Sequence, residues 1–467
     1  MAYYILKSYK FKRQELPKIF AILTRERNCF FLDSSLRYYS IGRGRYSILG
    51  AQPFHILKTK GTSPFKELRG VLSKYRIKRM NNSFPFFGGA VGYLSYDLGL
   101  ALGEKVKKLP KPDLGIPDSF FGFYNTSVII DHLKSQLYIL AIGFPEKSYR
   151  LARLLAQNNF KKISLLLAKS QAQIFPIESL TREIDSTLAY PDLSRGGINS
   201  NFTKQGYMQA IQKAKGYIRK GDIYQVNLSQ QFTSRTKLSS LEIYRRLRKS
   251  SPSYFSAYFD SGDFQILSSS PERFLKLEED LVITQPMKGT RPRGETEDKD
   301  YKFKKELLNS PKDKSELLMI VDLERNDLGR VCRYHSIKVV KLRELEKYKT
   351  VFQTTATICG RLHKDQDRID LLQACFPGGS ITGCPKIRAM QIIEELEPSK
   401  RAIYTGNLGY LSFSGDMDFN ILIRTILKKD DSLFFGVGGG IVTDSKPEEE
   451  YNETLVKARG ILQAIRG

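Results

Sequence analysis

The chain has 467 residues, of which 41% are hydrophobic and 11% aromatic; this is enough apolar material for a large core and excludes a disordered chain. No apolar run is long enough to span a membrane and the N-terminal residues lack the apolar centre of a signal peptide, so we expect a cytoplasmic protein without a membrane partner. The formal charge of +26 allows nucleic-acid binding or attraction of small anions, but the basic residues are dispersed and no nucleic-acid module is recognisable.

Cysteine and histidine usage limits the metal and redox chemistry. The five cysteines are an odd number with no CxxC pair, which argues against a disulfide framework or a zinc site. The four histidines show no metal-ligand spacing. Any metal should therefore be held by carboxylates and be a hard cation.

Residues 1–150 are predicted to be a β-rich N-terminal region. Short strands are expected at Phe30–Ser35, Arg45–Gly50 and Phe86–Asp97. The runs 127–132 and 136–141 predict a hairpin that turns at 133–135.

Residues 151–201 are predicted to hold a helix and a linker. The helix, over 149–169, should place Leu151, Leu154, Leu155 and Phe160 on one side. Glycine and serine in the run 194–200 indicate the linker, and the main domain boundary is placed there.

Residues 202–467 form the predicted catalytic region. Thr203 can cap a helix that ends near Gly221, and the alternating run Ile223–Ser229 predicts a strand. We expect hairpins at 254–268, 274–284 and 408–426, a helix within 300–327, a strand at 434–442 and a C-terminal helix. Hairpins that are followed by helices indicate an α+β fold and not a regular succession of βαβ units.

The run Thr284–Arg293 contains a lysine in unusual surroundings. Lys288 follows a β-rich run and lies between Pro286, which stops a strand ladder, and Gly289, which allows close approach. A lysine held at a strand end can be a nucleophile or an anion clamp. A solvated basic turn is the commoner outcome for such a cluster.

Two pairs of acidic residues have helical i,i+3 spacing. Glu450 and Glu453 lie on the C-terminal helix, away from its apolar stripe, and Asp313 and Glu316 lie on a helix before an apolar run. Two such pairs from separate helices could hold Mg²⁺. Taken alone, each pair is more typical of a solvated face.

A loop rich in glycine and hydroxyl groups, 376–386, precedes a predicted helix. Such a loop can cradle an anion, although the Walker spacing is absent and the glycines could also serve only for close packing.

Four motifs in this order resemble the chorismate-utilising enzymes. They are Pro286-Met-Lys-Gly-Thr290, the run 321–330 (VDLERNDLGR), the run 377–386 (PGGSITGCPK) and the run 444–454 (DSKPEEEYNET). The runs 31–34, 45–49 and 88–93 extend the resemblance over nearly the whole chain. It implies a large mixed α/β body with antiparallel sheets in the core and helices outside.

The resemblance also implies roles for individual residues. Glu316 and Glu453 would contact Mg²⁺, supported by Glu450 and Asp313, and Glu272 would be the general acid. Substrate-binding positions would be Gln225, Gly289, Thr290, Ser380, Tyr404, Arg424, Gly438, Gly440 and Lys457.

Two positions select a branch of this family. Isochorismate and salicylate synthases carry a lysine at the position of Gln225, where an amide has no useful basicity to activate water. Anthranilate synthases typically have alanine at the position of Lys288 and often histidine at that of Gln353. The resemblance thus implies a transferase that makes 4-amino-4-deoxychorismate, with Lys288 as nucleophile.

The expected substrates are chorismate and ammonia, with a separate glutamine amidotransferase subunit as the ammonia source, because no GxCxG-like glutaminase turn is present. The runner-up is anthranilate synthase component I. An alternative of another class is a basic nucleic-acid-binding protein on an enzyme fold. Residues 31–34 resemble the region where relatives bind tryptophan, which could be regulatory or only structural.

Overall fold

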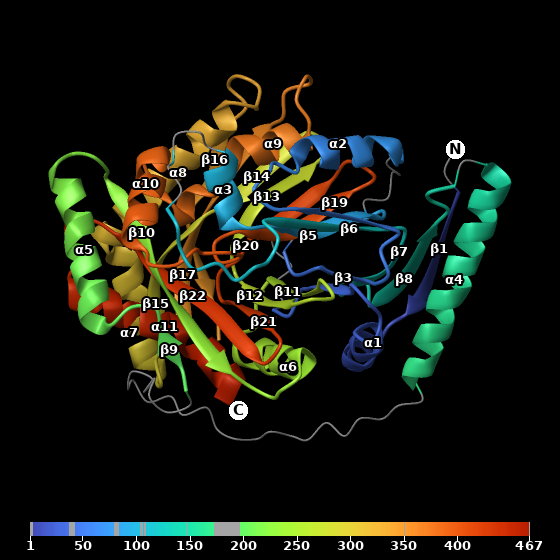
Figure 1. Cartoon of the computed structure of the whole chain (residues 1–467), viewed down its shortest axis with the longest axis horizontal. Coiled ribbons are helices and arrows are strands. Elements are labelled where there is room, and N and C mark those ends of the chain that lie inside the picture. The colour runs from blue at the N-terminus through green and yellow to red at the C-terminus, as the bar shows by residue number, and fades with distance from the viewer. Residues whose placement is uncertain are drawn as a thin grey trace.

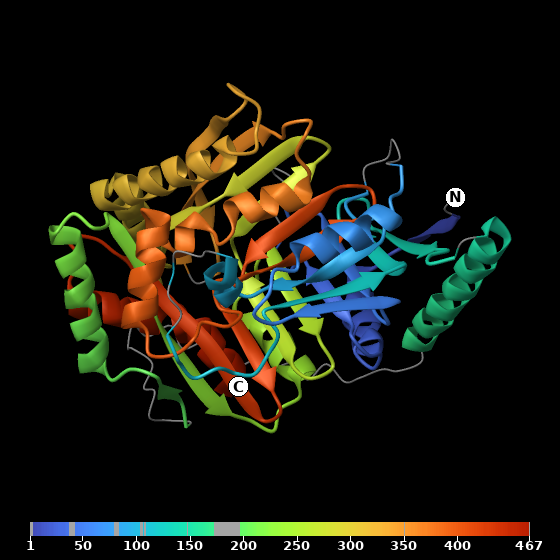
Figure 2. The same cartoon turned by 45° about the horizontal axis from the view of Figure 1, so that its top comes forward.

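In this computed structural model, two large antiparallel sheets pack face to face and helices cover their outer faces (Figures 1 and 2). The structure describes residues 3–36, 43–78, 84–102, 106, 109–146, 148–171, 197–349 and 351–466. This architecture confirms the expected α+β fold with antiparallel sheets inside.

The first sheet combines strands from both halves of the chain. Its order is β1 (Tyr4–Lys10), β8 (Gln136–Ile142), β7 (Thr126–Asp131), β3 (Tyr46–Gly50), β2 (Phe30–Asp33), β11 (Phe255–Asp260), β12 (Gln265–Ser270), β21 (Thr425–Lys429), β22 (Ser432–Ile441), β10 (Gln225–Arg235) and β18 (Gly383–Cys384), with β9 (Asn199–Ser200) beside β10. The pairing of β2 with β11 joins the predicted N-terminal and catalytic regions into one sheet.

The second sheet also combines strands from both halves of the chain. Its order is β15 (Met287–Pro292), β17 (Val351–Arg361), β14 (Leu281–Gln285), β13 (Arg273–Glu278), β20 (Met417–Ile421), β19 (Asn407–Ser412), β5 (Gly89–Leu94), β6 (Ser119–Tyr124) and β4 (His55–Thr59), with β16 (Lys338–Lys347) beside β17. Here β5 and β19 pair across the two regions. The predicted boundary near residue 201 therefore does not separate two sheets.

Helices lie on both outer faces. They are α1 (Leu16–Leu23), α2 (Phe65–Lys74), α3 (Tyr96–Leu102), α4 (Tyr149–Gln171), α5 (Lys204–Arg219), α6 (Ser240–Ser250), α7 (Glu297–Asn309), α8 (Pro311–Gly329), α9 (Arg368–Cys375), α10 (Lys386–Leu396) and α11 (Pro447–Arg466), with short 3-10 turns at Arg13–Glu15 and Gly379–Ile381. No helix of the described ranges combines the length and apolar character needed to cross a membrane.

The hydrophobic core has three main parts. One, between the sheets, contains Phe30, Tyr93, Phe120 and Phe259. A second joins the first sheet to α1, α6 and α11, and a third joins the second sheet to α2, α8, α9 and α10. The packing of the two sheets and the outer helices holds in place the strand ends that carry the candidate site.

Many elements begin and end where local chemistry predicts. The Thr203 side chain caps α5 by accepting a hydrogen bond from the Gly206 amide at 3.0 Å, and Gly221 follows the helix with φ of +78°. The predicted hairpins are present as β7–β8, β11–β12, β13–β14 and β19–β20.

Helices are present where they were predicted at 149–169 and within 300–327, but their details differ from the prediction. The helix expected within 300–327 is two helices, α7 and α8, separated at Ser310, whose side chain caps α8 ahead of Pro311. On α4, Leu151 and Leu154 are exposed while Ala152 and Ala156 are buried. Small residues let α4 approach β8 closely, which the hydrophobic pattern did not show.

Candidate active site

A cavity of about 420 Å³ lies where β10, β15 and β22 meet α8 and α11. All but one of the predicted catalytic, substrate-binding and metal residues line it: Glu272, Lys288, Gly289, Thr290, Asp313, Glu316, Ser380, Tyr404, Arg424, Gly438, Gly440, Glu450, Glu453 and Lys457. Gln225 lies just behind this lining: a Cβ placed on Gly440 would be 2.5 Å from Gln225 Nε2 and 3.3 Å from Lys288 Nζ. The fold thus gathers residues separated by more than 200 positions.

Lys288 lies inside a short strand, not at the end of one as predicted. Pro286 does end β14, but the chain resumes at once as β15 and pairs with β17, with an irregularity between Lys288 and Thr290. Gly289 sits in this irregularity with φ of +75°, a conformation that favours glycine. The Lys288 carbonyl accepts a hydrogen bond from Thr354 Oγ1 at 2.5 Å, which fixes the backbone beneath the amine.

The Lys288 amine and the Glu272 carboxyl are both perturbed by their surroundings. Burial, aided by the positive charge of Lys457, lowers the pKa of Lys288, although Glu316 and Glu272 oppose this. Burial raises the pKa of Glu272 to about 7, while the Ser380 hydroxyl opposes the rise. The cavity therefore shifts the Lys288 amine toward its neutral form and holds a proton on the Glu272 carboxyl near neutral pH.

The two acidic pairs line this cavity; Asp313 and Glu450 are buried, whereas the Glu453 side chain is 47% exposed. Burial raises the pKa of Glu316, and burial together with Glu453 raises that of Glu450. The charge of Lys457, whose Nζ lies 2.7 Å from Glu453 Oε1, lowers the pKa of Glu453. Asp313 is bound instead by Arg291 at 2.9 Å.

These carboxylates offer the oxygen donors that a hard cation needs. Across the described residues, no group of three or more His, Cys, Asp and Glu side chains is close enough to hold a metal ion. Lysines lie among the carboxylates instead: Lys312 Nζ is 3.5 Å from Glu450 Oε1 and 4.0 Å from Glu316 Oε1. The donor set fits Mg²⁺ in charge and chemistry, and Mg²⁺ stays a prediction.

Lys312 is a cavity residue that sequence reasoning missed. Its one signal was its position a helical turn before Glu316.

Arg424 projects into the cavity from a left-handed backbone position, with φ of +50°. Its NH2 donates to Gln353 Oε1 at 3.1 Å, and Gln353 Nε2 donates to Thr290 Oγ1 at 3.3 Å. Gln353 therefore holds a guanidinium and a hydroxyl in place at one wall of the cavity. A guanidinium in this position can bind a carboxylate with two parallel hydrogen bonds.

The loop at 376–386 contributes Ser380 to the cavity, while its lysine serves another purpose. Lys386 Nζ points away and donates to the carbonyls of Cys375 and Pro377, and it pairs with Asp327. The loop thus presents hydroxyl and backbone groups to the cavity, and its lysine ties the loop to α8.

Comparison with known proteins identifies the family. Residues 29–463 match the family described as chorismate binding enzyme. Anthranilate synthase component 1 of Acetivibrio thermocellus is 36% identical over 438 residues, 90% of this chain and 87% of the relative. Aminodeoxychorismate synthase component 1 of Bacillus subtilis (strain 168) is 36% identical over 477 residues, 98% of this chain and 96% of the relative. This chain belongs to the chorismate-binding enzyme family.

Solved structures agree with this membership. Anthranilate synthase component I from Streptococcus pneumoniae TIGR4 has a TM-score of 0.76 and 30% identity, covering 91% of this chain and 94% of that one. The menaquinone-specific isochorismate synthase from Escherichia coli has a TM-score of 0.72 at 16% identity, covering 100% of this chain and 95% of that one, which shows a shared fold. Equal identity to the two kinds of synthase leaves the branch open.

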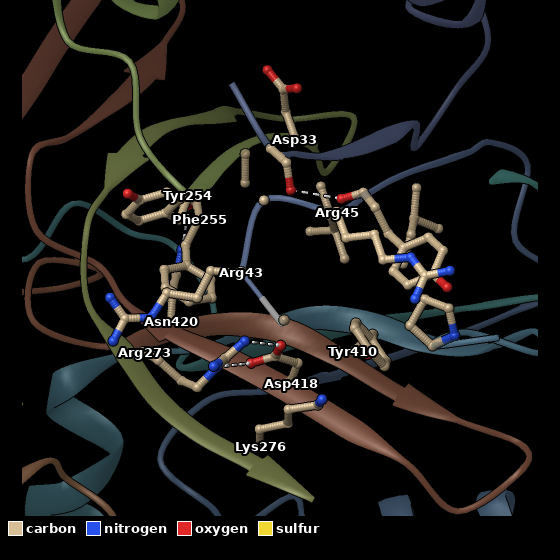
Figure 3. A pocket seen from close by; sticks show the side chains of 18 of the residues that line it. Asp33, Arg43, Arg45, Tyr254, Phe255, Arg273, Lys276, Tyr410, Asp418 and Asn420 are labelled. Atoms are coloured by element: carbon tan, nitrogen blue, oxygen red, sulfur yellow. Dashed lines mark hydrogen bonds and ion pairs between the residues drawn. The ribbon is translucent and has the colours of Figure 1, made fainter. Parts of the chain in front are cut away.

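A second cavity of this chorismate-binding enzyme, of about 340 Å³, lies between the two sheets (Figure 3). Its charged side chains are paired: Arg273 binds Asp418 at 3.0 Å, and Arg45 binds Asp131 at 2.8 Å. The Asp33 carboxylate accepts a hydrogen bond from Arg248 Nε at 2.5 Å. Residues Leu32, Asp33 and Ser34, from the run whose resemblance left a regulatory and a purely structural role open, line this cavity.

Proposed function

We propose that this chain is component I of an aminodeoxychorismate synthase, which converts chorismate and ammonia to 4-amino-4-deoxychorismate for p-aminobenzoate and folate synthesis. The observation that carries the proposal is the Lys288 amine, whose pKa burial lowers, in the same cavity as Glu272, whose pKa burial raises to about 7. A neutral amine and a protonated carboxyl are what covalent displacement of a hydroxyl requires.

The first step forms a lysine adduct. The Lys288 nitrogen attacks C2 of the ring, the two conjugated ring double bonds shift toward C4, and the C4–oxygen bond breaks. Glu272 gives its proton to the departing hydroxyl, which leaves as water, and the lysine nitrogen releases one proton to solvent. Two allylic steps thereby replace one crowded displacement at C4.

The second step releases the lysine. Ammonia attacks C4, the two conjugated double bonds shift back and the C2–nitrogen bond breaks, so that Lys288 leaves as an amine after taking up one proton from solvent. The Glu272 carboxylate accepts the proton that ammonia loses. Each group returns to its starting state.

The remaining cavity residues would bind and orient chorismate, which is a dianion. Arg424, held by Gln353, would bind one carboxylate. Mg²⁺ held by Glu316 and Glu453, with Glu450 and Asp313 behind them, would neutralise the other carboxylate beside the acidic helices.

Anthranilate synthase component I is the second candidate, supported by 36% identity to the A. thermocellus relative. In that reaction ammonia itself would add at C2 and stay there. Lys288 and the neutral amide of Gln353 favour the first candidate.

Product analysis tests this choice. We expect the purified chain with chorismate, Mg²⁺ and an ammonium salt to yield aminodeoxychorismate, and to use glutamine only after an amidotransferase partner is added. Anthranilate as the main product would assign the chain to the second candidate. Glutamine-dependent turnover by this polypeptide alone would contradict the expected need for a partner.

A further inference from the structure

A buried ion pair lies behind the lining of the candidate site. Glu397, which follows α10, is 4% exposed, and Arg401 is 5% exposed. Arg401 Nε donates to Glu397 Oε2 at 2.9 Å and its NH2 donates to Glu397 Oε1 at 2.7 Å. Glu397 Oε1 also accepts hydrogen bonds from the Ser229 amide at 2.8 Å and the Ser229 hydroxyl at 2.9 Å. The carboxylate therefore joins Arg401 to β10 through a planar, two-bond contact.

The other donors of Arg401 bind three segments of the cavity wall. NH2 also donates to the Asn227 carbonyl of β10 at 2.7 Å. NH1 donates to the Ile381 carbonyl at 3.0 Å and to Thr405 Oγ1 at 3.3 Å. All five N–H groups of the guanidinium are thereby used. Asn227 and Ile381 line the cavity, and Thr405 follows Tyr404, which also lines it.

The loop that carries Ser380 is held from two directions. Arg401 binds the carbonyl of the next residue, Ile381, and Asn227 Nδ2 donates to the Ser380 carbonyl at 3.4 Å. The Asn227 amide also donates to the Thr382 carbonyl at 2.8 Å. These bonds fix the backbone from which the Ser380 side chain reaches the cavity.

Tyr404 lies in a turn that begins at Arg401. The Tyr404 amide donates to the Arg401 carbonyl at 3.0 Å, and Ala402 and Thr405 have φ of +53° and +61°, a left-handed conformation that is strained for residues with a side chain. A Cβ placed on Gly436 would overlap the ring of Tyr404, so only a glycine of β22 lets the ring lie there. Strained backbone persists where the surroundings fix it, and the Arg401 guanidinium supplies such a contact at Thr405.

We propose that this ion pair positions Ser380 and Tyr404 to bind chorismate. Stability alone is a weak reason to bury an ion pair, since apolar side chains of similar volume often serve stability as well. A planar guanidinium with five donors in fixed directions instead sets the relative positions of β10, the Ser380 loop and the Tyr404 turn, which an apolar side chain cannot do. Arg401 is therefore a positioning residue, which acts through the two side chains ahead of it.

This inference rests on the proposed binding of chorismate in this cavity and not on the branch. Both candidate reactions start from chorismate, so its consumption measures the effect whichever product forms. Anthranilate as the product would reject the first candidate and leave the test of the ion pair intact.

Two substitutions keep both charges and change only the geometry of the pair. Arg401→Lys retains a cation beside Glu397 but loses the planar set of donors, and Glu397→Asp retains a carboxylate that is one carbon shorter. We expect either change to raise KM for chorismate at least about tenfold, because displaced binding groups lose contacts with the substrate. A purely structural defect would instead reduce the folded fraction, which lowers the measured kcat and leaves KM as it is.

A cycle of combined substitutions tests whether the effect passes through the two side chains. In a protein that already carries Ser380→Ala and Tyr404→Phe, Arg401→Lys should raise KM by only about threefold or less. Glu394→Gln is the matched control: it breaks a buried ion pair with Lys111, at 3.2 Å, on the helix that precedes Glu397, and should leave KM unchanged. An unchanged KM in both positioning variants, or the same increase with and without the Ser380 and Tyr404 hydroxyls, would overturn the proposal.

Discussion

At the scale of single residues, the candidate site shifts the pKa values of two groups in opposite directions within one cavity: that of Lys288 is lowered and that of Glu272 is raised. Lys288 is surrounded by protein and by the charge of Lys457, so its amine loses its proton more easily than an exposed lysine would. Glu272 is buried beside a hydroxyl and retains its proton to about pH 7. The same low-polarity surroundings thus produce a base and an acid.

Removing the Lys288 amine tests its role as nucleophile. We expect Lys288→Ala to lower formation of the 4-amino product at least about a thousand-fold, near 4 kcal/mol at 1.36 kcal/mol per factor of ten, because the covalent route is lost. Mass spectrometry of wild type with chorismate and no ammonia should show an adduct on Lys288.

Lys312→Ala is the matched control, since it removes a lysine from the same cavity without removing the nucleophile. The adduct should persist in this variant. Wild-type rates from Lys288→Ala, with no adduct trapped in the wild type, would rule out the covalent route.

At the scale of elements, α8 and α11 each turn an acidic face inward. The buried face of α8 carries Asp313, Glu324 and Asp327 among its apolar residues, and that of α11 carries Glu450. Such a face is stable only when another element supplies partners, as Arg291 and Lys386 do for α8. The residues on the inward faces of α8 and α11 therefore serve the candidate site as well as the hydrophobic core.

Neutralising one acid on either helix tests the metal assignment. We expect Glu316→Gln and Glu453→Gln to weaken Mg²⁺ binding, measured by calorimetry, at least about a hundred-fold and to abolish turnover with the fold retained. Glu449→Gln at the exposed cavity rim is the control and should bind Mg²⁺ as the wild type does. Near wild-type activity of either variant at low Mg²⁺ concentration would show that these residues are not the ligands.

At the scale of the whole molecule, the buried acids link stability to pH. The carboxyls of Glu272 and Glu324 have pKa values of about 7 and about 8 in the folded chain, whereas unfolded glutamates titrate at about 4.3. Between these values the folded state binds more protons than the unfolded state. The stability that these protons provide is complete below about pH 4 and is lost as the pH rises through about 8.

We therefore expect the free energy of unfolding of the metal-free chain to decrease from about pH 5 to about pH 8, by up to about 1.4 kcal/mol per pH unit for each group. Urea unfolding over a pH series measures this slope. Glu324→Gln should make it shallower, while Glu449→Gln, an exposed change, should leave it as it is. A stability that increases across this range would show that these acids are already ionised in the folded chain.

The sequence by itself determined the local elements and the types of residue at the site. Alternation and turn residues are properties of neighbouring positions, so the hairpins at 254–268 and 274–284 and the cap at Thr203 could be predicted. The motifs indicated the fold by resemblance. They also identified residues, Lys288 and Glu453 among them, that line one cavity.

The tertiary structure decided whether each helix face that the sequence left ambiguous lies inside the protein or in solvent. An i,i+3 acidic pair looks the same on a solvated helix and in a cavity, and only the packing of α8 and α11 around β15 and β22 places Glu316 and Glu450 inside. It also set Gln225 behind Gly440, exposed Leu154 on α4, and buried Glu324 behind the loop at Gly379. Each depends on contacts between distant segments, and these contacts leave no periodic trace in the sequence.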